Sequence, residues 1–149
     1  MYNTYMNDTG REEQAGLFTL LHAAEVAGSH VESKLAAVGL SLAKLAALTA
    51  LREAGESMPL SQLAERLSCV KSNITQLVDR LEADGLVSRA GDPHDRRSRL
   101  AVMTPAGRIA CEAGTRIRQQ AENVLLSEMS GAERQQLASL MAKLEKSAR

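Results

Sequence analysis

A cluster of polar side chains near the middle of the chain has the chemistry to bind bases and phosphates. Its members are Lys71, Ser72, Asn73, Thr75, Gln76 and, one turn further on, Arg80. Asn and Gln can form paired hydrogen bonds with adenine, while Lys, Ser and Thr can bind phosphates or base edges. Apolar residues recur among them at helical spacing, so a helix over 72–84 would bury one face and present the polar cluster to solvent. A merely solvated helix face is the alternative interpretation.

A second cluster lies just downstream, in a charged turn. It consists of His94, Asp95, Arg96, Arg97 and Arg99. Two short strand-like runs, 86–90 and 98–103, flank the turn and predict a β-hairpin with a basic tip. A guanidinium at such a tip can enter a narrow minor groove, where the negative potential of DNA is strongest. We expect Asp95 to orient a neighbouring arginine, because an unpaired carboxylate would oppose binding to DNA.

The elements around these clusters predict how they are held. Ser61 is a candidate N-cap for a short helix over 62–67, and a break of four residues separates this helix from the one over 72–84. Two helices joined by such a turn place the second helix in the major groove of DNA. The segment before the first helix, 56–59, is expected to be a short extended link.

A long amphipathic helix is predicted before this centre, over 11–38, and two helices are predicted after it, within 104–147, with a shorter helix over 42–52. The residues that would cap them are Ser41, Thr104 followed by Pro105, and Ser130 paired with Glu133. The outer helices carry more apolar surface than a centre over 40–103 can cover. We therefore expect them to pair with the same helices of a second copy of the chain.

Composition excludes several classes of function. The chain has 18 basic and 18 acidic residues, so any nucleic-acid footprint must be local. Aromatic residues make up 2%, which argues against modules that stack single-stranded bases. The sequence carries no catalytic motif, Gly-rich phosphate loop or metal-ligand set, so we expect neither an enzyme nor a cofactor. It has no membrane span or signal peptide, so we expect no membrane partner and a cytoplasmic location.

At these residues the sequence resembles the MarR family of bacterial regulators, which are winged-helix homodimers that bind operator DNA. The similarity lies between Leu60 and Gly107, in the segments LSQLAERL, KSNITQLVDRLEADGLVSR and DPHDRRSRLAVMTPAG. It implies a recognition helix that begins near Lys71, with Arg97 in the minor groove and a dimer interface made by the first and the last two helices. The sequence departs from the family pattern at Val70, where a capping polar residue is common.

The resemblance also implies an effector, for which the sequence leaves two options open. Family members commonly bind small phenolic or other lipophilic ligands between the dimerisation helices and the winged domain, and others respond to cysteine oxidation. Candidate ligand-binding residues on the first helix are Phe18, Leu21, His22 and Glu25, although a core or interface role is the simpler interpretation. Cys69, beside the recognition helix, is the candidate redox residue, although a buried and inert cysteine is commoner. His22 and His30 lack the further ligands that a metal site needs.

These patterns predict a mainly α-helical chain with a small β-hairpin wing, in which a winged helix-turn-helix is flanked by dimerisation helices. We expect a DNA-binding transcriptional regulator, most simply a repressor. It would act as a homodimer on a pseudo-palindromic operator and be released by a small ligand. The alternatives are a redox-responsive regulator that uses Cys69 and a winged-helix module for protein contact, which would prefer no DNA sequence.

Overall fold

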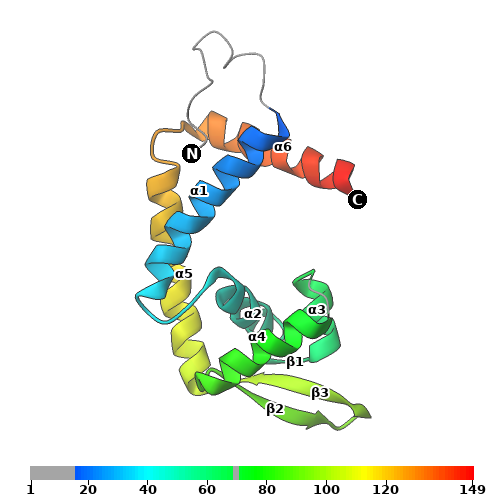
Figure 1. Ribbon diagram of the computed structural model, residues 1–149. Coiled ribbons are helices and arrows are strands. Elements are labelled where there is room, and N and C mark those ends of the chain that lie inside the picture. Colours follow the sequence, from blue (N-terminus) through cyan, green and yellow to red (C-terminus); the bar gives the residue numbers. More distant parts are fainter. Residues whose placement is uncertain (1–15, 69–70) are drawn as a thin grey trace.

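The computed structural model describes residues 16–68 and 71–149, which form six helices and a small antiparallel sheet (Figure 1). The elements are α1 (Leu17–Ala36), α2 (Leu42–Glu53), β1 (Ser57–Pro59), α3 (Leu60–Arg66), α4 (Lys71–Ala83), β2 (Val87–Asp92), β3 (Asp95–Met103), α5 (Pro105–Leu125) and α6 (Gly131–Ala148). This order is a winged helix-turn-helix with helices on both sides, so the predicted fold class is confirmed. The part of the first predicted helix over 11–15 lies outside the described residues.

Local signals place most helix ends correctly. The hydroxyl groups of Ser41 and Thr104 each accept a backbone N–H from the first turn of α2 and α5, at 3.1 and 3.0 Å. Ser130 and Glu133 form the predicted capping box at the start of α6. Gly85 ends α4 with a φ of +72°, a conformation that glycine adopts without strain. These contacts lie within one turn of sequence, which is why the sequence alone predicts them.

The segment around Pro59 differs from the prediction. Residues 57–59 form strand β1 rather than an extended link, with Ser57 opposite Val102 and Pro59 opposite Leu100 of β3. Helix α3 then begins directly at Leu60, after Pro59 at its N-cap position, so the prediction of Ser61 as the cap is wrong. Because Pro59 closes the strand with a φ of −57°, it is already in the φ range of a helix and the chain turns at once into α3.

The wing is longer than predicted. Strands β2 and β3 pair from Val87 opposite Met103 to Gly91 opposite Arg99, and the pairing reaches Asp92 opposite Asp95 after an irregularity. The sheet order is β1-β3-β2, so β3 lies in the middle. The wing thus projects from the helices as a two-stranded ribbon with its turn at the far end (Figure 1).

The core fills the winged part of the molecule, where α2, α3, α4 and the sheet meet. Its largest fully buried side chains are Leu35, Leu48, Leu51, Leu63, Ile74, Val78, Leu81, Val87 and Cys111. Helix α5 joins this core at Gly107, where an added Cβ would lie 2.0 Å from the carbonyl oxygen of Leu86. Glycine therefore permits the close contact between the start of α5 and the chain that enters the wing.

The long helices leave much of their apolar surface uncovered. Helices α1 and α5 lie side by side above the winged part, and α6 crosses near their far end (Figure 1). Phe18 is 86% exposed and Ile109 69% exposed, and α6 has no buried residue. The prediction that the outer helices carry more apolar surface than the centre covers is confirmed, and Ile109 and Val124 of α5 are among the exposed apolar residues. No helix of the described part is both long enough and apolar enough to cross a membrane.

Candidate nucleic-acid interface

Helix α4 presents a polar face to solvent because its large apolar residues are turned inward. Ile74, Leu77, Val78 and Leu81 are buried, as the spacing predicts. The predicted contact residues Asn73, Thr75, Gln76 and Arg80 are exposed on the other side, together with Asp79. The side chains of Lys71 and Ser72, and the whole of Cys69, lie outside the described part of the chain. At 13 residues the helix is about 20 Å long, which suits the major groove.

The wing tip is shaped by two carboxylates that accept backbone hydrogen bonds. Asp92 Oδ1 accepts the N–H of His94, and Asp95 Oδ1 accepts the N–H of Arg97, each at 2.9 Å. The expectation that Asp95 orients an arginine side chain is therefore corrected, since its hydrogen bond goes to an arginine backbone. An Asp side chain in a tight turn reaches the amide two residues on more easily than a flexible guanidinium. The side chains of His94, Arg96, Arg97 and Arg99 are exposed.

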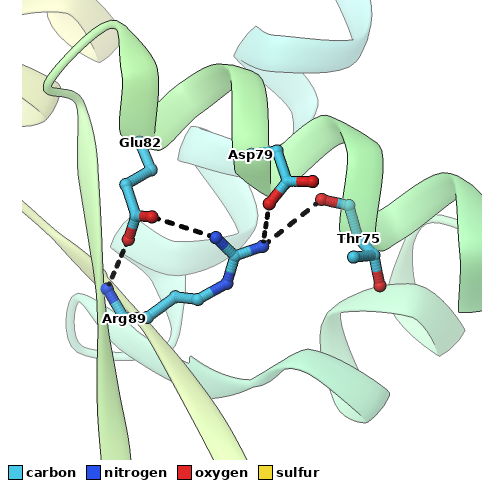
Figure 2. Close-up of polar contacts among 4 residues, drawn as sticks. All are labelled: Thr75, Asp79, Glu82 and Arg89. Carbon is cyan, nitrogen blue, oxygen red and sulfur yellow. Dashed lines mark hydrogen bonds and ion pairs between the residues drawn. The ribbon is translucent and has the colours of Figure 1, made fainter.

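Arg89 of β2 links the wing to α4, although it is not among the contact residues that the sequence predicts. Its guanidinium lies 2.5 Å from Asp79 Oδ1 and 3.0 Å from Glu82 Oε1, and donates to the carbonyl oxygen of Thr75 at 3.4 Å (Figure 2). The hydrogen bond to Asp79, with the charges of Asp79 and Glu82, raises the pKa of Arg89 above its ordinary value. The sequence does contain a signal for the inward orientation of Arg89, because Arg89 follows buried Val87 by two residues and so lies on the same face of the strand.

The end of α4 is joined directly to the start of α5. The hydroxyl of Thr104 donates to the carbonyl oxygen of Gly85 at 2.6 Å, and the backbone N–H of Thr104 donates to the carbonyl oxygen of Leu86 at 3.1 Å. One turn into α5, Arg108 forms two hydrogen bonds of 2.6 Å with Glu56, just before β1. The hydrogen bond from Arg108 lowers the pKa of Glu56. The end of α4, the sheet and α5 are therefore connected by short polar contacts.

A cavity of about 360 Å³ lies between α2, α3 and α5. Its lining combines apolar side chains with charged and hydroxyl groups: Leu42, Leu45, Ala46, Thr49, Ala50, Arg52, Glu53, Arg66, Leu67, Thr115 and Arg118. Arg66 and Glu53 form an ion pair with each other. The four candidate ligand-binding residues of α1, Phe18, Leu21, His22 and Glu25, are exposed and do not line this cavity. In the described part of the chain, no group of three His, Cys, Asp or Glu side chains could hold a metal ion.

Comparison with known proteins decides the family. Residues 40–98 match the profile of the MarR family. The chain is 33% identical over 110 residues to the HTH-type transcriptional repressor MdtR of Bacillus subtilis, an alignment that covers 74% of this chain and 70% of MdtR. The chain belongs to the MarR family. Like other MarR-family proteins, it is a DNA-binding transcriptional regulator and not an enzyme.

Solved structures agree with this assignment. A probable transcriptional regulator from Pseudomonas aeruginosa is 30% identical, with a TM-score of 0.80 over 90% of this chain and 98% of that one. A cysteine-to-serine mutant of E. coli MarR complexed with operator DNA shares the fold at 22% identity, with a TM-score of 0.80 over 93% of this chain and 99% of that one. Bordetella bronchiseptica BpsR also shares it, at 24% identity and a TM-score of 0.76, over 86% of this chain and 96% of BpsR. The resemblance to the MarR family is thus confirmed.

Proposed function

We propose that this MarR-family regulator represses transcription as a homodimer bound to a pseudo-palindromic operator, and that a small ligand releases it. The observation that carries the proposal is the uncovered apolar surface of α1, α5 and α6. Its members are Leu17, Phe18, Leu21, Val26, Ile109, Val124, Leu125, Leu140, Met141 and Leu144. Full burial of one such side chain contributes about 1.5–3 kcal/mol, so a second copy that covers these faces would be strongly stabilised.

In this proposal, separate segments of the chain form the dimer interface and bind DNA. Helix α1 with the preceding residues from 11 on, and the C-terminal segment 104–147, form the dimer interface, while residues 40–103 bind DNA. Two α4 helices then enter successive major grooves, about 34 Å apart on one side of the duplex. Asn73 and Gln76 read bases, and Arg97 enters the minor groove. MdtR is a repressor and the relative BadR of Rhodopseudomonas palustris is an activatory protein, so the proposed direction of control follows MdtR, whose alignment covers more of this chain.

The cavity between α2, α3 and α5 supports release by a ligand. It lies where the proposed dimerisation helix α5 meets the DNA-binding part, so a bound molecule would alter the angle between them. Apolar Leu42, Leu45 and Leu67 suit a lipophilic or phenolic ring, and Arg66 or Arg118 could bind an acidic group on it. The DNA binding of the structurally similar BpsR is regulated by 6-hydroxynicotinic acid, an aromatic acid. A ligand can shift binding only by its difference in affinity for the two forms.

The deciding experiment is a selection of binding sites from a random DNA pool, followed by fluorescence anisotropy on the enriched duplex. We expect a two-fold symmetric sequence that binds two protomers and is preferred over random DNA by about a thousandfold or more. Equal binding to all sequences would contradict the proposal and favour a module for protein contact. Aromatic acids and phenols added to the complex should then release DNA, whereas release by peroxide alone would favour redox control through Cys69.

A further inference from the structure

The wing carries one arginine whose side chain faces the protein instead of the solvent. Arg89 lies in the middle of β2, and its side chain is 22% exposed, whereas the arginines at the wing tip are exposed. Strand alternation explains this orientation, because Arg89 shares a face with buried Val87. Arg89 is thus the member of the basic wing that is turned toward α4.

The contacts of Arg89 extend along α4 instead of ending at one partner. Thr75, Asp79 and Glu82 are separated by four and three residues, so they lie along one side of the helix over about 10 Å (Figure 2). The backbone N–H of Arg89 adds a fourth contact, donating to Glu82 Oε2 at 3.1 Å. A single ion pair would let the ribbon pivot, but contacts at several points along the helix fix its direction.

The partner Asp79 is an unfavourable residue for DNA binding on its own. It lies on α4 one turn beyond Gln76 and Thr75, and its side chain is 59% exposed. A carboxylate at this place would repel phosphates if it were unpaired. The ion pair with Arg89 offsets that charge and uses it to hold the wing.

We propose that Arg89 is a positioning residue for DNA recognition, which fixes the wing to α4 so that the wing tip and the exposed face of α4 reach neighbouring grooves together. This role rests on the proposed function, because it needs a sequence-specific complex in which both elements contact DNA. Arg89 acts through Asp79 and Glu82, because its guanidinium donates to both carboxylates and to the Thr75 carbonyl.

The substitution Asp79→Asn separates this role from simple electrostatics. It removes a negative charge near DNA, so electrostatics alone predicts tighter binding to every duplex. If Arg89 positions the wing, D79N instead weakens binding to the selected duplex by about tenfold, the size of one lost groove contact, while affinity for random duplex stays equal or rises. Tighter binding of D79N to the selected duplex would overturn the proposal.

A double-substitution test then asks whether Arg89 acts through the wing. We expect R89Q to weaken binding to the selected duplex, and R89K to have an affinity between those of R89Q and the wild type. The loss of affinity caused by R97A should be smaller in the R89Q background than in the wild type. Independent, additive losses for R89Q and R97A would overturn the positioning role. R108Q is the matched control, because it breaks an arginine–glutamate pair that does not involve α4.

Hydrogen exchange of the free 149-residue chain tests the same link without DNA. R89Q is expected to speed amide exchange in β2 and β3 and to leave α5 unchanged, while R108Q is expected to leave the wing protected. Unchanged exchange in the wing of R89Q overturns the proposal. If the wild type enriches no sequence from the random pool, the proposed function fails, and the exchange comparison still decides whether Arg89 fixes the wing.

Discussion

At the scale of single residues, the arginines of the wing differ in what their loss should do. Arg97 is exposed at the tip, so Arg97→Ala should remove a contact with DNA and leave the fold intact. We expect weaker binding and a salt dependence whose logarithmic slope falls by about one unit, as for one lost phosphate-type contact. Anisotropy titrations at several salt concentrations measure both quantities.

The control for Arg97→Ala is Arg149→Ala, which removes the same charge from the exposed end of α6. Its binding curve should overlay that of the wild type at each salt concentration. If Arg97→Ala binds as tightly as the wild type throughout the same series, the assignment of Arg97 to the minor groove is wrong.

Glu56 makes stability depend on pH through its pairing with Arg108. The pKa of Glu56 in the folded chain lies below its ordinary value of 4.5, because Arg108 stabilises the charged carboxylate. The pairing therefore stabilises the fold above about pH 4.5 and is lost as pH falls through the lowered pKa. Glu56→Gln should lower the free energy of unfolding at pH 7 and flatten its decline below pH 4.5.

Urea denaturation of the wild type and Glu56→Gln, at pH 7, 5, 4 and 3 and at one protein concentration, tests this expectation. Glu145→Gln on α6 is the matched control, since it makes the same change of charge at an exposed position. Parallel pH profiles for Glu56→Gln and the wild type would show that the pair with Arg108 contributes nothing to acid stability.

At the scale of elements, the sequence predicts what local chemistry decides and misses what packing decides. The caps at Ser41, Thr104 and Ser130 act within one turn, so the local sequence alone locates them. Strand β1 exists because β3 offers it a hydrogen-bonding edge, and its three residues show no strand pattern of their own. Its pairing partner lies about forty residues away, which no local pattern reveals.

The candidate site likewise combines features that the local sequence predicts with features that depend on packing. Exposure of Asn73 and Gln76 follows from the helical period of α4, which the sequence displays. The role of Arg89 depends on how β2 lies against α4, and the strand alternation that turns Arg89 inward does not reveal by itself which helix it meets. The alternation of β2 and the spacing of Asp79 and Glu82 become informative only when the two elements are considered together.

The junction of α5 with the wing gives a prediction at this scale. Gly107→Ala would bring a Cβ within 2.0 Å of a backbone oxygen of Leu86, which cannot move as a flexible side chain can. We expect a loss of stability of about 1–3 kcal/mol, because the start of α5 must shift. Thermal unfolding followed by circular dichroism measures the change.

Gly131→Ala is the matched control, because an added Cβ at Gly131 meets no atom within 4 Å in the described structure. Alanine at this helical position should leave stability unchanged or raise it by up to about 1 kcal/mol. If Gly107→Ala unfolds at the same temperature as Gly131→Ala, the junction is not tightly packed.

At the scale of the whole molecule, the exposed faces of the long helices connect stability with DNA recognition. Leu140 and Leu144 lie one turn apart on α6 and are 49% and 48% exposed. In the proposed homodimer both would be buried, so Leu140→Glu with Leu144→Glu would place charges in an apolar interface. We expect the doubly substituted chain to be a monomer in sedimentation equilibrium, with the winged part still folded.

The same variant tests why two copies are needed on DNA. One recognition helix contacts half of a palindromic site, and joining two of them makes the second contact effectively intramolecular. Loss of the dimer should therefore weaken operator binding by about a hundredfold or more while leaving affinity for a single half-site unchanged. Ser139→Glu, which adds a charge at an exposed polar position of α6, should remain dimeric. A doubly substituted chain that still sediments as a dimer would place the interface elsewhere, whereas a monomer with full operator affinity would contradict the need for two recognition helices.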